Sequence, residues 1–261
     1  YSSFYKPHKE NKLPAHRKFI QSLVTDNKHV SKHYHEQLNR LDNISKQRLL
    51  FGNWEYDDSD DKLINYDAIL STFDNKNLDV GDSYITADIA RYGKDKTVIV
   101  YWCGLRAEQF VTMNTNSVTE AADKIKELQQ RYSVPLANIC VDEDGVGGGV
   151  KDILRCKGFV NNSKALKGEN YVNLKTQCYY TLADYINKLN IYIRCEDIKV
   201  KNSITEELEQ VRRKNYDKDT KLQLIPKEDV KTALGRSPDY ADAIMMRMVY
   251  ELKATGKYFI H

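Results

Sequence analysis

The chain has 261 residues, of which 41% are hydrophobic and 10% aromatic, enough apolar material for a sizeable core. Glycine (12 residues) and proline (5 residues) are scarce, which excludes a collagen-like, low-complexity or disordered protein. The 40 basic and 37 acidic residues nearly cancel, so net charge alone does not indicate a nucleic-acid partner. Any basic surface would have to be local.

The five cysteines are scattered along the chain, odd in number and without a C-x-x-C pair. This pattern favours reduced thiols in a cytosolic protein over a disulfide framework or a zinc site. No apolar run approaches the roughly 20 residues that a membrane helix needs. The chain begins at Tyr1 without a signal-like apolar segment, so we expect a fragment of a longer protein.

Charge divides the first third of the chain. Residues 1–50 carry ten Lys or Arg against four acids, whereas residues 55–74 carry seven acids and one Lys. We expect a basic helical stretch at 31–51, followed by an acidic linker. After that linker the sequence becomes rich in β-forming residues. This change predicts a domain boundary between residues 75 and 76 and hence two parts, 1–75 and 76–261.

The second part predicts alternating strands and helices. Runs rich in β-branched residues predict strands at 84–89, 97–102 and 108–113, and the apolar run 137–141 predicts a fourth strand. Ser117 and Glu120 form a capping-box pattern that predicts a helix start. Further helices are expected at 150–156, 174–189, 197–213 and 240–252, with a late strand at 221–225. This order predicts an α/β fold with a mixed sheet flanked by helices.

Three aspartates occupy positions where a charge is costly. Asp88 interrupts an apolar strand, Asp142 ends the fourth strand before a glycine-rich turn, and Asp242 lies in an otherwise apolar helix. A buried carboxylate must be paired, hydrogen-bonded or bound to a metal. Three converging carboxylates would repel one another and raise at least one pKa, and Mg²⁺ or Mn²⁺ would relieve that conflict. The pattern therefore indicates a divalent-metal site.

Structural interpretations compete with this hypothesis. Asp88 could be a hydrogen-bonded structural carboxylate, and Asp142 could accept backbone amides at its turn. Asp242 is harder to explain in this way, because a helix interior offers no free amides. The glycine run 145–149 lacks the last glycine of a dinucleotide fingerprint, and the chain has no G-x-x-x-x-G-K-[ST] loop. We therefore expect a steric role for these glycines and no ATPase activity.

Tyrosines and lysines are interleaved in the segment 164–185. Such a mixture can stack on bases and pair with phosphates, or it can form ordinary half-buried helix faces. The residues concerned are Lys164, Lys167, Tyr171, Lys175, Tyr179, Tyr180 and Tyr185.

Three stretches together resemble the nuclease domain of the large terminase subunit of tailed bacteriophages. They read Asp88-Ile-Ala-Arg-Tyr-Gly-Lys-Asp-Lys-Thr-Val98, Val141-Asp-Glu-Asp-Gly-Val-Gly-Gly-Gly-Val150 and Ser237-Pro-Asp-Tyr-Ala-Asp-Ala243. The resemblance covers about residues 80–253. Upstream, Arg48-Leu-Leu-Phe-Gly-Asn-Trp-Glu55 looks like the end of the ATPase half of that family, whose phosphate-binding motifs are absent from this sequence.

The resemblance implies a ribonuclease H-like fold and a Mg²⁺- or Mn²⁺-dependent endonuclease that cuts concatemeric double-stranded DNA during viral genome packaging. Asp88 and Asp142 would be the central-strand and fourth-strand carboxylates, and the third would be Asp242 or, as an alternative, Asp239. Asp88 would bridge two ions, and Asp144 or Glu143 could assist. Residues 1–75 would be the remnant of the ATPase domain. The implied partners are the small terminase subunit and the portal, in the cytoplasm of the bacterial host.

Within the third stretch, Ser237 suits an N-cap and Pro238 the first helical position, which places Asp239 in the first turn. The helix dipole explains a carboxylate there, so Asp242 is the preferred metal ligand.

Charge and position suggest phosphate contacts, which are Lys94, Lys96, Arg212, Arg213 and Lys214. Two other functions stay open: another ribonuclease H-like nuclease, such as a junction resolvase or an RNA-strand hydrolase, and a non-catalytic DNA-gripping module. An actin-like sugar kinase is disfavoured by the missing phosphate loops.

Overall fold

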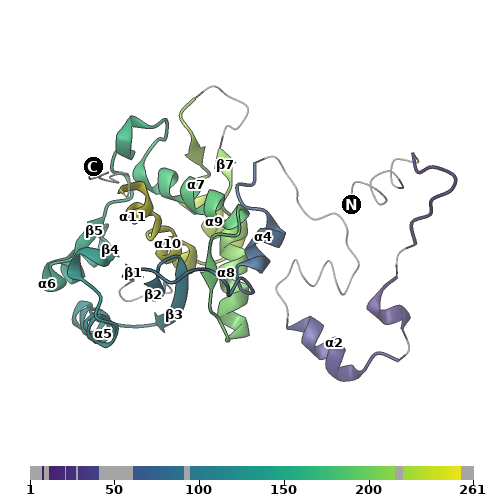
Figure 1. Ribbon diagram of the computed structural model, residues 1–261, viewed down its shortest axis with the longest axis horizontal. Coiled ribbons are helices and arrows are strands. Elements are labelled where there is room, and N and C mark those ends of the chain that lie inside the picture. Colours follow the sequence, from purple (N-terminus) through teal and green to yellow (C-terminus); the bar gives the residue numbers. More distant parts are fainter. Residues whose placement is uncertain are drawn as a thin grey trace, which may run out of the picture. The chain divides into compact units, whose positions relative to one another are not determined.

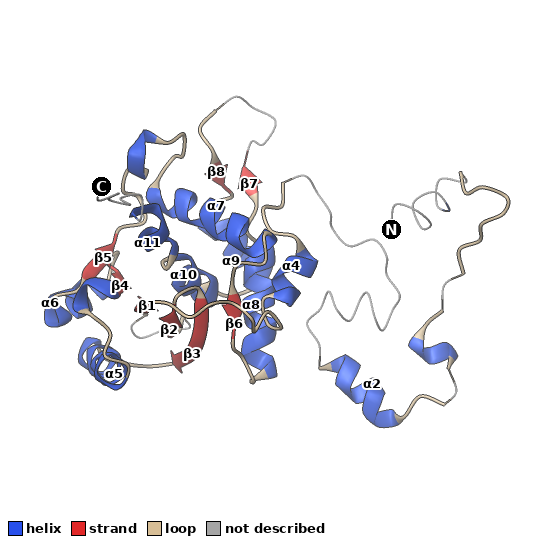
Figure 2. Ribbon diagram, viewed as in Figure 1, coloured by secondary structure: helices blue, strands red, loops and turns tan. Residues whose placement is uncertain are grey.

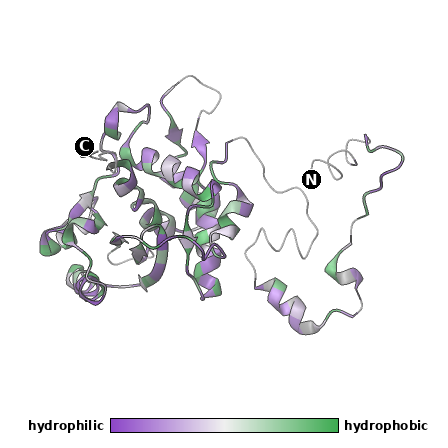
Figure 3. Cartoon of the chain, in the orientation of Figure 1, coloured by the Kyte–Doolittle hydropathy of each residue, from purple (hydrophilic) through white to green (hydrophobic). Residues whose placement is uncertain are grey.

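The computed structural model describes residues 8, 12–20, 22–27, 29–40, 61–90, 95–214 and 220–253, and the chain forms two compact units, Tyr1–Ser59 and Asp60–His261. The first unit contains the 3-10 helix η1 (Val24–Asp26) and helix α2 (Lys32–Asn39). The hydroxyl of Ser31 caps α2 by accepting a hydrogen bond from the backbone amide of Tyr34. Helix α2 is mostly hydrophilic (Figure 3). The predicted basic helix is thus observed up to Asn39, and 41–60 lie outside the described residues.

The second unit is built on a six-stranded mixed sheet with the order β5-β4-β1-β2-β3-β6 (Figure 2). Strands β1, β2 and β3 are antiparallel neighbours, β4 runs parallel to β1, β5 parallel to β4, and β6 parallel to β3. The strands are β1 (Ser83–Asp88), β2 (Thr97–Cys103), β3 (Arg106–Met113), β4 (Ile139–Asp142), β5 (Lys157–Phe159) and β6 (Tyr192–Ile193). The predicted α/β fold with a mixed sheet is confirmed. Strands β5 and β6 were not predicted, because runs of three and two residues carry no readable alternation.

Hydrophobic side chains of the sheet belong to two cores, one on each face of the sheet. Along β2, Val98, Val100 and Trp102 belong to one buried cluster, while Ile99 and Tyr101 belong to the other. The second cluster is covered by α5 (Val118–Arg131) and α6 (Gly147–Leu154), as Figure 1 shows. Alternation along a strand sends successive side chains to opposite faces, so β2 is buried on both.

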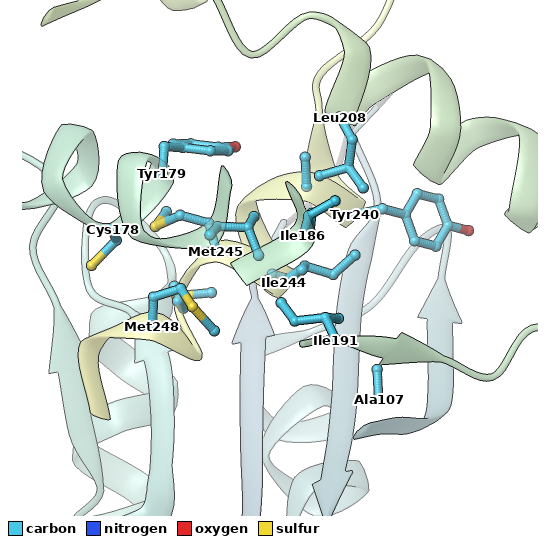
Figure 4. Packing of buried hydrophobic residues seen from close by; sticks show 14 of the residues in the cluster. Ala107, Cys178, Tyr179, Ile186, Ile191, Leu208, Tyr240, Ile244, Met245 and Met248 are labelled. Atoms are coloured by element: carbon cyan, nitrogen blue, oxygen red, sulfur yellow. The ribbon is translucent and has the colours of Figure 1, made fainter. Parts of the chain in front are cut away.

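The larger core lies on the other face of the sheet. Its helices are α4 (Tyr66–Ser71), α7 (Leu174–Asn187), α8 (Ile198–Glu209), α10 (Asp239–Met245) and α11 (Met248–Lys253). Figure 4 shows Ile244, Met245 and Met248 packed among side chains of α7 and α8. The described part of the chain contains no helix that is both long and apolar enough to cross a membrane.

The closing helix is broken where the sequence predicts one continuous helix at 240–252. The hydroxyl of Thr86 on β1 donates to the carbonyl of Ala243 at 2.7 Å. The amide of Arg247, which would bond that carbonyl in a regular helix, bonds Ile244 instead. A tertiary hydrogen bond thus ends α10 at Met245 and starts α11 at Met248.

Three other elements differ from the prediction. Helix α6 begins at Gly147 rather than at Val150. The late strand is only Gln223–Leu224 (β8), and it pairs with β7 (Arg213–Lys214) in a separate two-stranded sheet. Helix α9 (Lys227–Leu234) was not predicted. The remaining described elements are the 3-10 helices η2 (Leu136–Asn138) and η3 (Leu166–Gly168).

The second unit begins before the predicted boundary at 75/76. Ile64, Ile69 and Phe73 are buried in the larger core, and Ile69 is fully inaccessible. The segment 60–75, interpreted from its charge as part of a linker, therefore contains helix α4 and packs with the sheet unit. Helix α4 itself contains a single acid, Asp67, and the other acids of 55–74 lie outside it, so the charge of the segment as a whole did not indicate this apolar helix.

Candidate metal centre

Two of the predicted carboxylates lie at adjacent strand ends. Asp88 is the last residue of β1, and Asp142 is the last residue of β4. Ala87 is the register partner of Val141 in this parallel pair, so the next residues of both strands are neighbours. Because parallel strands end at the same edge of a sheet, both carboxylates lie at one edge.

Asp88 is the most unusual of these residues. It is only 9% exposed, and its carboxylate makes no hydrogen bond or ion pair with any part of the chain that the structure describes. Burial raises the pKa of Asp88 well above its ordinary value, and the negative charges of Asp242 and Asp142 raise this pKa further. A structural carboxylate would be hydrogen-bonded, and within the described residues Asp88 has no such partner.

Asp142 is held by its own turn. Its Oδ1 accepts hydrogen bonds from the backbone amide of Asp144 at 3.1 Å and from Nδ2 of Asn161 at 3.2 Å. Asn161 also donates twice to Oδ2 of Asp144, through its backbone amide and its side chain. Burial raises the pKa of Asp142 to about 6, although the amide of Asp144 opposes this shift.

A glycine allows this turn to fold over Asp142. A Cβ atom at Gly147 would lie 1.6 Å from the carbonyl oxygen of Asp142, which no side chain can tolerate. The first turn of α6 therefore passes directly against the end of β4, as the steric interpretation of the glycine run predicts.

The third carboxylate, Asp242, comes from α10 and is 6% exposed. It accepts a hydrogen bond from the hydroxyl of Tyr179 at 2.7 Å and forms ion pairs with Lys175 at 2.7 Å and Lys227 at 3.3 Å. Burial favours the neutral acid, but the two ammonium groups outweigh it and hold the pKa of Asp242 below its usual value. The two lysines thus supply positive charge to Asp242, the position where the sequence predicts a metal ion.

Asp239 lies on the same helix and is 7% exposed. The helix begins at Asp239 with Pro238 as its N-cap residue, and the hydroxyl of Ser237 is buried without a hydrogen-bond partner in the described chain. The prediction that Ser237 caps this helix is therefore wrong by one position. Asp239 instead accepts a hydrogen bond from the backbone amide of Lys96 at 2.8 Å, and burial raises the pKa of Asp239 to about 6.

Asp88, Asp239 and Asp242 are buried and Asp142 is half-buried, and the negative charges of the other three all raise the pKa of Asp88. Within the described residues, no three His, Cys, Asp or Glu side chains are arranged as a ready metal site. In this structure the ammonium groups of Lys175 and Lys227 pair with Asp242. The donor set of hard carboxylate oxygens, three with raised pKa values, nevertheless suits Mg²⁺ or Mn²⁺.

The other predicted residues are distributed differently. Asp144 lies beside Asp142, whereas Glu143 is paired with Lys151 at 2.6 Å. Lys94 lies outside the described residues. Lys96 contributes its backbone amide to Asp239, and Arg212 lines a cavity next to Asp242. Arg213 and Lys214 form β7.

Sequence reasoning missed four residues of this centre. Lys175 and Tyr179 are four positions apart on α7 and so share a face, a spacing that could have indicated a common target. They were interpreted only as part of a lysine and tyrosine mixture. Lys227 and Asn161 carry no local signal, because only the tertiary fold brings them to the carboxylates.

Comparison with known proteins supports this architecture. No family model matches the sequence, and no curated protein sequence matches it. Among solved structures, the chain is similar to the nuclease domain of the large terminase subunit gp2 of bacterial virus Sf6, with a TM-score of 0.63 and 21% identity. The match covers 72% of this chain and 98% of that chain.

A lysine-to-alanine mutant of the same Sf6 domain, solved with manganese, gives a TM-score of 0.62 at 19% identity with the same coverage. The mutant with manganese and beta-thujaplicinol gives 0.62 at 20% identity, also over 72% of this chain and 98% of that chain. The likeness at this identity concerns the fold. It confirms the predicted ribonuclease H-like α/β architecture, which is that of the phage terminase nuclease domains.

Proposed function

We propose that this chain contains a Mg²⁺- or Mn²⁺-dependent endonuclease that hydrolyses phosphodiester bonds of double-stranded DNA. The observation that carries the proposal is Asp88, a buried carboxylate without a partner in the described chain, beside three further aspartates at one sheet edge. A bound cation would stabilise the ionised form of this carboxylate. The manganese complexes of the Sf6 domain, which shares the fold, support the choice of a divalent metal.

Asp88, Asp142 and Asp242 would hold the metal, with Asp239 and Asp144 as further candidate ligands. A divalent cation bound there supplies the charge that activates water and stabilises the leaving oxygen in phosphodiester cleavage. The protein's own part is orientation. Asn161 fixes Asp142 and Asp144, and Tyr179 fixes Asp242 through its hydroxyl.

Lys175 and Lys227 have a second part in this proposal. Each would turn its charge from Asp242 toward the DNA phosphates when a cation neutralises that carboxylate. Lys94, Lys96, Arg212, Arg213 and Lys214 are the further candidate phosphate contacts.

The likeness to terminase nuclease domains suggests a biological role for the enzyme. The enzyme would cut concatemeric viral DNA during packaging, in the cytoplasm of the bacterial host, with the small terminase subunit and the portal as partners. The chain before residue 60 would belong to the end of the ATPase domain, whereas 60–75 pack with the sheet unit, and we expect no ATP hydrolysis by this chain.

The direct test is to incubate supercoiled plasmid with the chain and Mn²⁺, with and without EDTA. We expect nicked and then linear plasmid with little sequence preference, and no cleavage in EDTA or with Asp88→Asn. Cleavage that persists in EDTA would remove the metal from the proposal. No cleavage by the folded protein with either metal would favour a DNA-gripping module. Branched DNA and RNA–DNA hybrid in parallel reactions would detect a resolvase or an RNA-strand hydrolase.

A further inference from the structure

A cavity of about 420 Å³ shares Asp242 and Asp144 with the carboxylate cluster, whereas Asp142 does not line it. Its floor includes Asp242, Asp144, Lys175 and Lys227, whereas Asp88 does not line it. Further lining residues come from α7, α8 and α9 and from β8. The volume lies within the range in which proteins enclose small organic groups. A strand with its scissile phosphate at the carboxylates would therefore have a neighbouring nucleotide at the cavity.

One part of the wall consists of side-chain amides. Two of them, Asn161 and Asn173, are used internally, because Asn161 holds Asp142 and Asn173 caps α7. Gln210 and Gln223 also line the cavity, and their side chains make no hydrogen bond to the part of the chain that the structure describes. Amides that both donate and accept match the edge of a nucleobase.

The rest of the wall is apolar. Val230 of α9 lines the cavity together with four further aliphatic side chains. These are Val172, Val211, Leu224 and Ile225. Val172 is 44% exposed, so this apolar surface continues to the mouth of the cavity. Apolar walls with a few polar groups fit a flat ring that is apolar on its faces and polar at its edge.

We propose that this cavity binds the base and sugar of one unpaired nucleotide adjacent to the scissile phosphate. The proposal rests on the nuclease function proposed above and specifies the form of its substrate. A paired base cannot enter, because its edge is occupied by its partner, so the nucleotide must leave the stack. DNA that already contains an unpaired nucleotide avoids this cost, and the enzyme should prefer it over fully paired DNA.

The test uses one short DNA duplex in two forms, fully paired and with a single extra nucleotide in one strand, in Mn²⁺. We expect the wild-type protein to cut the bulged duplex about tenfold faster, with the cuts at phosphates flanking the extra nucleotide. Equal rates on both duplexes, or cuts unrelated to the bulge, would overturn the proposal while leaving the nuclease function intact. Absence of any Mn²⁺-dependent cutting would instead overturn the nuclease function.

Val230→Trp fills the cavity, so the unpaired nucleotide then has no site to enter. The ratio of the cleavage rates on bulged and fully paired duplex should fall to about one. Val80→Trp is the matched control, since Val80 is 76% exposed and does not line the cavity. The double variant Gln210→Ala and Gln223→Ala serves as a second test that leaves the backbone and core unchanged. Each protein must show the wild-type shift of melting temperature with Mn²⁺. Retention of the full preference by both cavity variants would overturn the proposal.

Discussion

The Glu207 carboxylate of α8 accepts a hydrogen bond of 2.8 Å from the backbone amide of Ala241 in the first turn of α10. Helix α10 has no side-chain cap of its own. Glu207, 34 positions earlier in the chain, instead accepts the hydrogen bond of the Ala241 amide, which has no partner within the helix. The side chain of Glu207 is fully buried and is paired with Arg236. Burial raises the pKa of Glu207 to about 8, although Arg236 opposes the shift. The position of Asp239 and Asp242 thus depends on a contact with α8.

Glu207→Ala should lower the free energy of unfolding by about 2–4 kcal/mol, because it removes the buried partner of Arg236 and leaves the amide of Ala241 unsatisfied. Urea unfolding followed by circular dichroism measures this. Glu206→Ala is the control, since Glu206 lies on the same helix, pairs with Arg236 at 3.4 Å and is 41% exposed. We expect the control to cost less than about 1 kcal/mol. Equal costs for both variants would contradict the cap.

The opposite end of α10 is held by Thr86, whose hydroxyl donates to Ala243 and accepts a hydrogen bond from Nε1 of Trp102 at 3.0 Å. Thr86→Val keeps the shape but leaves a buried carbonyl and a buried indole unpaired, so we expect a loss of about 2 kcal/mol. Plasmid cleavage should also fall, because β1 carries Asp88 and α10 carries Asp242. Thr232→Val, at an exposed helix position, should change neither quantity. Unfolding curves and cleavage rates of the two variants decide the point.

Asp142 predicts a pH dependence of the metal-free protein. Its pKa is about 6 in the folded state and near 3.8 when unfolded, so the folded protein binds the proton more tightly. The stabilising contribution of the proton is complete below pH 4 and is lost as the pH rises through 6. Asparagine does not titrate, so Asp142→Asn removes this loss of stability. Between pH 4 and 6 the free energy of unfolding of the variant should rise relative to that of the wild type by at most about 2 kcal/mol, because Asp142 is partly exposed.

Melting temperatures of both proteins in EDTA, measured from pH 4 to pH 7, test this expectation. Mn²⁺ at pH 7 should stabilise the wild type more than the variant, because the variant lacks one ligand charge. A difference between the two proteins that does not change with pH would contradict a raised pKa of Asp142.

The main strands, and the positions of Asp88 and Asp142 at the ends of two of them, were predictable because their signals are local. Asp88 and Asp142 each follow an apolar run, and parallel pairing then brings the two strand ends together. The break in the closing helix was not predictable, because the hydroxyl of Thr86 comes from a strand 157 residues away. Local propensity favours a continuous helix there, and a tertiary contact overrides it. Glu207 and Lys227 contact α10 in the same way, through tertiary contacts that no sequence spacing indicates.

Asp239 and Asp242 compete as the third metal ligand, and the structure separates their expected behaviour. Asp239→Asn keeps an oxygen that can accept the hydrogen bond from the amide of Lys96, so it should stay folded and keep measurable activity. Asp242→Asn removes the negative charge that pairs with Lys175 and Lys227. Lys175, whose side chain is only 19% exposed, then lacks its ion-pair partner. We expect Asp242→Asn to be inactive and to lose about 1–3 kcal/mol of stability in the metal-free protein.

Mn²⁺-dependent plasmid cleavage and urea unfolding in EDTA, carried out on both variants, give the comparison. Lys175→Met in the Asp242→Asn background should recover part of the lost stability, because it removes the unpaired cation, but it should not recover cleavage. That separation of stability from activity is what a ligand role for Asp242 requires. The reverse pattern, with Asp239→Asn inactive and Asp242→Asn active, would assign the third ligand to Asp239 and leave Asp242 as the counter-ion of the two lysines.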